Sequence, residues 1–198
     1  MMYREMANAG GNTNLENRLV TDWHCPLTPE YREDFSNALR AYGMKTLWYV
    51  CCSPRHPYAN FASLECPPRE ARILGWQTWA FGSDGLLYWL VNGWPERIKL
   101  DESDTYFPDW PTANVLHMPG DGVLMYPGRE HVLPSIRLAC VRDGVEDYER
   151  LDAAAAKFGR ELVTKAAKRV TPSMTDFDRT GLKLLGIRAA LADRCEKR

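Results

Sequence analysis

One stretch of this sequence decides the fold: Gly82-Ser83-Asp84-Gly85-Leu86-Leu87-Tyr88-Trp89-Leu90-Val91-Asn92-Gly93-Trp94. Its turn residues open a short apolar run, Leu86 to Val91, which predicts a strand buried on both faces, as in a parallel sheet. Asn92 and Trp94 follow where that strand leaves the sheet. In α/β folds the carboxyl ends of such strands bind ligands. The stretch therefore predicts both an architecture and the position of a site.

The composition is that of an ordinary globular protein. The 198 residues are 45% hydrophobic and 26% charged, with a formal net charge of −1, so neither nucleic acid nor a membrane is expected as a partner. No apolar run approaches the roughly 20 residues that cross a bilayer. Residues 1–14 carry no signal-peptide core. We leave the location open and expect the cytoplasm if Met1 is the true start.

The cysteines do not indicate a metal site. No C-x-x-C pair occurs and no histidine stands at zinc-finger spacing, so we expect no metal and no cofactor. Small buried hydrophobic side chains are the better interpretation. The six are Cys25, Cys51, Cys52, Cys66, Cys140 and Cys195. All seven tryptophans, in contrast, fall within the first 110 residues, which makes that part the candidate binding region and the rest a helical scaffold.

Strand and helix patterns alternate through the first half of the chain. This alternation predicts parallel strands joined by helical crossovers. Strands are expected at 18–23, 46–51, 86–91 and 122–126, and helices at 28–42, 69–81, 135–148, 153–170 and 176–195. The long segment 93–120 has little periodicity and predicts a functional loop or lid.

Four strands are about half of an eight-stranded barrel. The predicted fold class is therefore α/β, specifically the C-terminal half of a TIM-type (β/α)8 barrel with about four parallel strands plus C-terminal helices. Without repeats or a clear linker, residues 1–198 form one expected domain, with a flexible N-terminus at 1–17 and a C-terminal helix within 171–198. An incomplete barrel leaves two alternatives for completion, a homodimer or a missing N-terminal half.

Several motifs occur in the order found in one known family. They are Trp48-Tyr49-Val50-Cys51-Cys52 with Pro54 and Pro57-Tyr58-Ala59-Asn60, Gly85-Leu86-Leu87-Tyr88-Trp89, Gly120-Asp121-Gly122 with Tyr126-Pro127-Gly128, Pro134-Ser135-Ile136-Arg137-Leu138, and Arg142-Asp143-Gly144-Val145-Glu146-Asp147-Tyr148-Glu149. From about Leu19 to Leu151 the chain resembles the C-terminal part of the catalytic domain of glycoside hydrolase family 123, also catalogued as domain of unknown function 4091.

The resemblance implies a (β/α)8 barrel that removes β-linked N-acetylgalactosamine, or a related sugar, from chain ends. It also implies substrate assistance, in which the acetamido oxygen attacks the anomeric carbon while an adjacent Asp–Glu pair orients the acetamide and transfers the proton. In the family this pair lies upstream of the matched region. Asp101-Glu102, the one Asp-Glu dipeptide before the helical tail, falls in the long loop, where a solvated role is the better interpretation.

We therefore expect no catalytic residue in this chain and leave open whether it is an enzyme. The leading interpretation is a carbohydrate-processing protein that resembles an exo-acting β-N-acetylhexosaminidase but lacks the acid/base pair. The alternative is a non-catalytic carbohydrate-binding or structural remnant of a barrel. A glycan or amino sugar is the expected ligand in the first case.

The candidate substrate-binding residues lie at predicted strand ends and in one loop. Trp94 is either a platform for the apolar face of a sugar or a loop anchor. Asn92 either binds sugar hydroxyls or caps the loop backbone. Tyr126 either presents its hydroxyl to a ligand or packs. Tyr49 is more often a core residue, and Asn60, in the proline-rich loop, is the weakest candidate.

Overall fold

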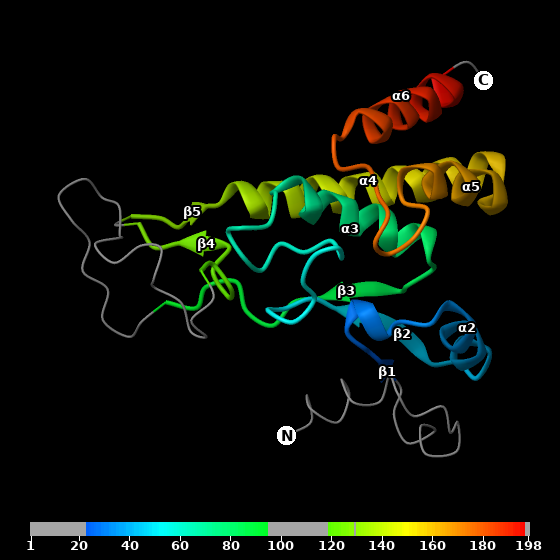
Figure 1. Cartoon of the computed structure of the whole chain (residues 1–198). Helices are drawn as coiled ribbons and strands as arrows, with labels where there is room; N and C mark the ends of the chain where they lie inside the picture. The colour runs from blue at the N-terminus through cyan, green and yellow to red at the C-terminus, as the bar shows by residue number, and fades with distance from the viewer. Residues whose placement is uncertain (1–22, 95–118, 129, 197–198) are drawn as a thin grey trace.

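A parallel three-stranded sheet forms one layer of the structure, in the order β1-β2-β3 (Figure 1). The computed structural model describes residues 23–94, 119–128 and 130–196. The strands are β1 Trp23–His24, β2 Lys45–Tyr49 and β3 Gly85–Leu87. Parallel pairing of all three confirms the α/β class. The expected flexible terminus 1–17 lies outside the described residues, as does most of the expected loop 93–120.

The pairing register brings the ends of β2 and β3 level. Tyr49 pairs with Leu87, so both strands leave the sheet at the same edge. β3 is shorter than the predicted strand 86–91, and its side chains are half-buried or exposed, with Leu87 38% exposed. The prediction of burial on both faces is therefore wrong for the described sheet, because β3 is an edge strand with a neighbour on one side.

The predicted fourth parallel strand at 122–126 is also wrong. Its last two residues form β4, Met125–Tyr126, which pairs antiparallel with β5, Leu133–Pro134, in a separate two-stranded sheet. The physical reason is local. A turn with two left-handed glycines, Gly120 and Gly122, precedes β4, and the chain reverses after it into β5 instead of running on into a helix.

Five α-helices lie in the described ranges. They are α2 Glu33–Ala41, α3 Arg69–Ala80, α4 Ile136–Phe158, α5 Arg160–Val170 and α6 Leu182–Glu196. α3 matches its prediction closely. The predicted helix 28–42 is split, because Tyr31 and Arg32 are extended between a 3-10 turn, Thr28–Glu30, and α2. None of these helices is long and apolar enough to cross a membrane.

The boundaries of α4 and α6 follow from their capping groups. Ser135 Oγ accepts a hydrogen bond from the Leu138 amide and starts α4. Gly159, at φ 90°, separates α4 from α5. α6 begins later than the predicted residue 176, because the Asp178 carboxylate accepts bonds from the amides of Thr180 and Leu184 and holds a turn there.

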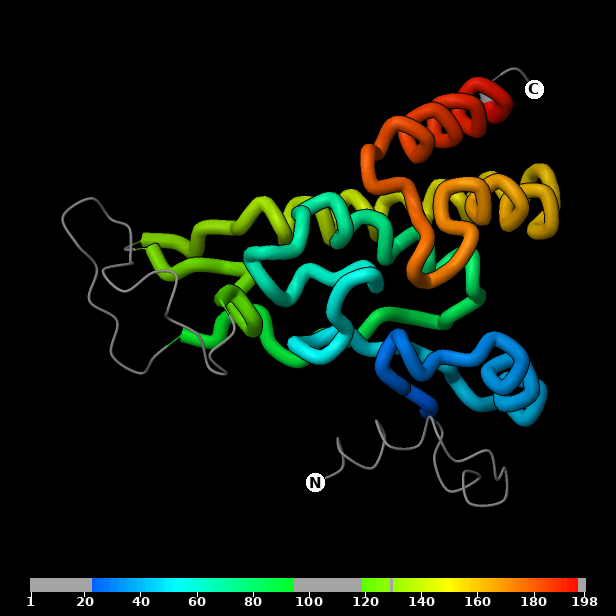
Figure 2. Tube along the Cα trace, in the orientation of Figure 1, coloured from blue at the N-terminus to red at the C-terminus, as the bar shows by residue number. Residues whose placement is uncertain are grey.

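Helices α3 and α4 run side by side above the sheet; α5 packs beside both of them, and α6 lies on the side of α4 away from the sheet (Figures 1 and 2). The core lies between the strands and these helices. Its largest fully buried side chains include Trp48, Phe61, Leu74, Trp76, Trp79 and Leu151. Trp76 and Trp79, both on α3, therefore pack in this core.

Two glycines set the distance between α3 and α4. A Cβ atom added to Gly75 would lie 2.2 Å from the carbonyl oxygen of Gly144, and one on Gly144 would lie 3.0 Å from the carbonyl oxygen of Arg72. The two backbones therefore touch at a point where no side chain fits. Every residue that α3 and α4 place toward the sheet depends on this contact.

We predict that Gly75→Ala lowers the free energy of unfolding by about 1–3 kcal/mol, because the added methyl group pushes α4 away from α3. Urea denaturation followed by circular dichroism measures the change. Gly186→Ala is the matched control, since a Cβ at this α6 position meets nothing within 4 Å and alanine favours the helix by about 1 kcal/mol. Equal effects of the two substitutions would contradict the role given to the contact.

Candidate ligand site at the carboxyl ends of the strands

A buried aspartate lies where β2 and β3 leave the sheet. Asp121 is 0% exposed. Its Oδ1 accepts hydrogen bonds from Tyr88 Oη at 2.8 Å and from Trp89 Nε1 at 3.0 Å. The amide of Gly122 in turn donates to Tyr88 Oη at 2.7 Å. The two residues that follow β3 are thus tied to the turn that carries Asp121.

The glycines on either side of Asp121 make this arrangement possible. Gly120 has φ 90° and Gly122 has φ 76°, a backbone region that other residues rarely adopt. A Cβ on Gly122 would lie 2.9 Å from Cζ2 of Trp89, and one on Gly120 would lie 2.8 Å from Cγ of Leu64. An aspartate between two glycines, Gly120-Asp121-Gly122, shortly before an apolar strand pattern was the signal in the sequence that could have identified this centre.

The groups around Asp121 are neutral donors at neutral pH. Burial raises the pKa of Tyr88, so its phenol keeps the proton that it donates. Burial also raises the pKa of the Cys51 thiol to about 11, with smaller contributions from Cys52 and Asp121. Asp121 Oδ2 is buried and has no hydrogen-bond partner among the described residues. Asp121 is therefore a buried residue that holds Tyr88 and Trp89 in position.

Arg137, in the first turn of α4, holds the surrounding loops together. Its side chain is buried, and its Nη1 donates to the carbonyl oxygens of Phe61, Ala62 and Gly120 at 2.8–2.9 Å. Its Nη2 donates to the carbonyl oxygen of Val123. One guanidinium group thereby joins the loop after β2, the Asp121 turn and α4.

Three of the predicted residues come together beside this turn. Asn92 forms an antiparallel bridge with Val123, and Trp94 Nε1 donates to the carbonyl oxygen of Met125 at 2.8 Å. Asn92 is exposed, whereas Trp94 and Tyr126 are half-buried. The segment after β3 thus runs antiparallel to the segment that leads into β4. The indole N–H of Trp94 fixes its segment to Met125. This bond fits the interpretation of Trp94 as a loop anchor and leaves its role as a sugar platform open.

The other two predicted residues lie deeper. Tyr49, the last residue of β2, is 7% exposed. Asn60 is buried, and its Nδ2 donates to the carbonyl oxygens of Cys51 and Pro54. Its Oδ1 accepts from the amides of Phe61 and Ala62. Both donors and both lone pairs of this side chain are thus used to shape the loop, and a ligand would have to break one of these bonds.

A second buried carboxyl group lies behind this loop. Glu70, at the start of α3, accepts hydrogen bonds from the backbone N–H of Asn60 and from Arg179 Nη1, and burial raises the pKa of the Glu70 carboxyl group. Its partners indicate that it fixes the loop to α3. Across the described ranges, no three His, Cys, Asp or Glu side chains are grouped so that they could hold a metal ion, and the six cysteines form no disulfide.

The chain is similar to proteins of one known family. The family model described as "Glycoside hydrolase 123, catalytic domain" matches residues 3–154. A solved family 123 glycoside hydrolase from Clostridium perfringens, studied for glycolipid glycan hydrolysis, superposes with a TM-score of 0.69 at 17% identity. The match covers 93% of this chain and 34% of that enzyme, so the chain spans about a third of its length. A comparison with the curated proteins finds no match.

At this identity the likeness to the solved enzyme concerns the fold alone. The superposition nevertheless includes nearly the whole chain, so the arrangement of sheet, helices and strand ends recurs in that enzyme. The family model ends within α4 and leaves α5 and α6 outside the matched region. The carboxyl ends of the strands lie inside it.

We predict that Tyr88→Phe lowers the free energy of unfolding by about 1–2 kcal/mol, because Asp121 loses a donor and the Gly122 amide loses its acceptor. Thermal or urea unfolding measures the loss. Tyr42→Phe is the control, since Tyr42 is 67% exposed. If both variants retain the stability of the parent chain, the hydroxyl of Tyr88 does not support the turn.

Proposed function

Because this chain belongs to the glycoside hydrolase 123 family through its catalytic domain, we propose that it supplies a glycan-contacting surface of such a domain. The observation that carries this proposal is the pairing of residues 91–94 with residues 122–126, in the segment that follows the carboxyl end of β3. Ligands of α/β folds bind at this edge of the sheet. Asp121 and Arg137 hold the two segments in place.

The ligand is a glycan that ends in a β-linked N-acetylhexosamine, with N-acetylgalactosamine as the first choice. This is what the resemblance to the family implies, and the Clostridium perfringens enzyme was studied for glycolipid glycan hydrolysis. Trp94 offers an aromatic face to the C–H side of the sugar. The amide of Asn92 and the hydroxyl of Tyr126 bind sugar hydroxyl groups, and Tyr49 lines the floor.

The chain positions the sugar but does not cleave it unaided. The resemblance implies an Asp–Glu pair that lies upstream of the matched region, and Asp101-Glu102, the one Asp-Glu dipeptide before the helical tail, is expected to be solvated. Asp121 cannot take that role, because it is 0% exposed and its Oδ1 is bound to Tyr88 and Trp89. It is a positioning residue that acts through these two side chains.

We also propose that this chain forms half of a (β/α)8 barrel, which another segment or a second copy completes. Three parallel strands with helices on one side are what a section of a (β/α)8 barrel would contain. The 38% exposure of Leu87 on β3 is consistent with a further strand beside it. Either a second copy of this chain or an N-terminal half of the barrel would provide that strand.

We predict that N-acetylgalactosamine binds the chain and that Trp94→Ala weakens the affinity about tenfold, because the sugar loses its aromatic platform. Isothermal titration calorimetry measures the affinity. Trp23→Ala is the matched control, since Trp23 is 54% exposed and pairs with Lys45 at the opposite, amino end of the sheet. Unchanged affinity in a correctly folded Trp94→Ala variant would contradict the assignment.

We also predict that the isolated chain releases no nitrophenol from 4-nitrophenyl N-acetyl-β-galactosaminide above the uncatalysed rate. An absorbance assay with a concentrated sample tests this. Hydrolysis that disappears in a Glu102→Gln variant would overturn the non-catalytic proposal and assign the acid/base role to the loop. Sugar binding without hydrolysis is the expected combination.

A further inference from the structure

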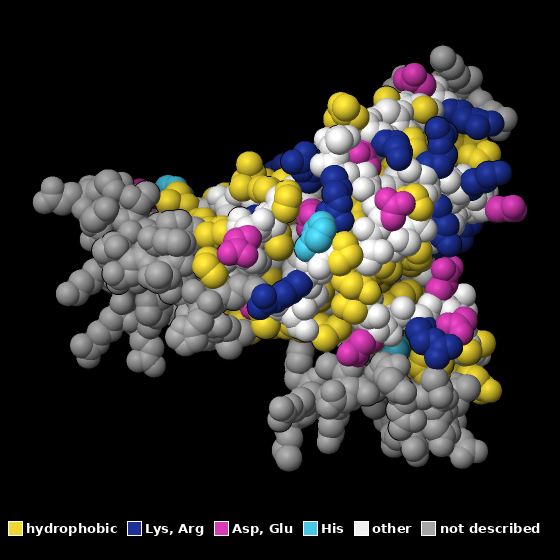
Figure 3. Space-filling model, in the orientation of Figure 1, with side chains coloured by type: hydrophobic (Ala, Val, Ile, Leu, Met, Phe, Trp, Pro, Cys, Tyr) yellow, Lys and Arg dark blue, Asp and Glu magenta, His cyan; other side chains and the backbone are white. Residues whose placement is uncertain are grey.

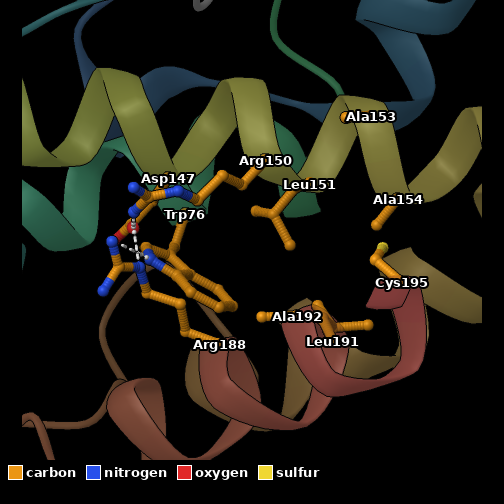
Figure 4. A pocket seen from close by; sticks show the side chains of 10 residues that line it. All are labelled: Trp76, Asp147, Arg150, Leu151, Ala153, Ala154, Arg188, Leu191, Ala192 and Cys195. Carbon is orange, nitrogen blue, oxygen red and sulfur yellow. Dashed lines mark hydrogen bonds and ion pairs between the residues drawn. The ribbon is translucent and has the colours of Figure 1, made fainter. Parts of the chain in front are cut away.

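A cavity of about 240 Å³ lies between α4 and α6 (Figure 4). Leu151 and Ala154 line it from α4, Leu191 lines it from α6, and Trp76 reaches it from α3. It is larger than the ~150 Å³ apolar cavities that bind benzene in other proteins. The walls from α3 and α4 lie inside the region that the family model matches, and the wall from α6 lies beyond it.

One end of the cavity is charged. The Asp147 side chain is fully buried there. Its carboxylate accepts bonds from Arg72 Nε at 2.6 Å, Arg72 Nη2 at 3.1 Å and Trp76 Nε1 at 2.9 Å. Arg72 thus forms a bidentate pair with this carboxylate, and its Nη1 also lies 3.9 Å from Asp143 Oδ2.

Two more arginines nevertheless converge on the same carboxylate (Figure 4). Arg188 Nε lies 2.9 Å and Arg150 Nη1 lies 3.7 Å from Asp147 Oδ1. Arg150 has a second, 3.9 Å contact with Glu146, whereas in the described part of the chain Arg188 has an ion pair with Asp147 only. Arg188 Nε is also buried without a well-oriented hydrogen bond. The charged end of the cavity thus has more positive than negative charge.

The surface formed by α5 and α6 has the same sign, whereas α4 carries five acidic and four basic residues. Lys and Arg outnumber Asp and Glu on both α5 and α6, and Figure 3 shows their side chains gathered at this end of the molecule. Such a field attracts anions. The Arg188 and Arg150 side chains are 34% and 53% exposed, so an anion from solvent can reach their guanidinium groups.

We propose that this cavity binds a small amphipathic carboxylate. Its hydrocarbon tail lies among Leu151, Ala154 and Leu191, where burial of methylene groups drives binding. Its carboxylate binds the guanidinium groups of Arg188 and Arg150, whose planar forks suit a carboxylate in two-point contacts. The ligand supplies the negative charge that Asp147 does not, and it ties α6 to α4.

Octanoate is the probe for this site. Calorimetric titration of the full chain should detect one bound octanoate per chain, and the ligand should raise the midpoint of thermal unfolding. Octanol has the same tail without the charge and should bind about tenfold or more weakly, because charge-assisted hydrogen bonds are lost. Absence of octanoate binding, or equal affinity for octanol, would overturn the proposal.

Substitutions at the two ends of the cavity test whether octanoate binds there. Arg188→Gln should weaken octanoate about tenfold, while Lys183→Gln, which removes an exposed charge from the same helix, should leave the affinity unchanged. Ala154→Leu fills the apolar end and should abolish binding. If that variant does not fold, Leu191→Ala serves instead and should weaken binding by removing part of the wall. Octanoate affinity that is insensitive to Arg188→Gln and to the wall substitution would refute the assignment.

Discussion

The guanidinium group of Arg137 is the interaction on which the carboxyl end of the sheet depends. It is buried, and four backbone carbonyl groups receive its hydrogen bonds. A buried charge is tolerated only when such dipoles replace water. Because those carbonyl groups belong to the loop after β2 and to the turn around Asp121, their positions are fixed relative to α4. Neither segment has regular secondary structure that could hold it otherwise.

Asp121 and the glycine contact of α3 with α4 extend this constraint. Asp121 attaches the residues after β3 to its own turn, through Tyr88 and Trp89. The contact of Gly75 with Gly144 sets how closely α4, and with it Arg137, approaches the strands. The three features form a continuous support under Asn92, Trp94 and Tyr126. Most polar groups in this support bond to other parts of the protein, so the ligand contacts that we propose fall to the residues above it.

On the helical side of the molecule the main polar feature is a buried ion-pair cluster. There the buried carboxylate of Asp147 lies between α3, α4 and α6 and receives three arginine side chains. A carboxylate can satisfy only part of that charge, and the apolar space next to it is not filled by protein. The two ends of the molecule therefore present different chemistry, an aromatic and amide surface at the strand ends and a cationic, apolar cavity between helices.

The sequence by itself determined the α/β class and the helix α3, because hydrophobic periodicity and turn residues act locally. It placed the end of the third strand at Val91, four residues beyond Leu87, where β3 ends. It also carried the ordered motifs of the family. It did not determine that β4 pairs antiparallel with β5 in a separate sheet. It also did not determine that the side chain of Asn60 uses its hydrogen bonds to shape its own loop. Only the tertiary structure decided these points and the burial of Asp121, because they depend on hydrogen bonds between segments that lie far apart along the chain.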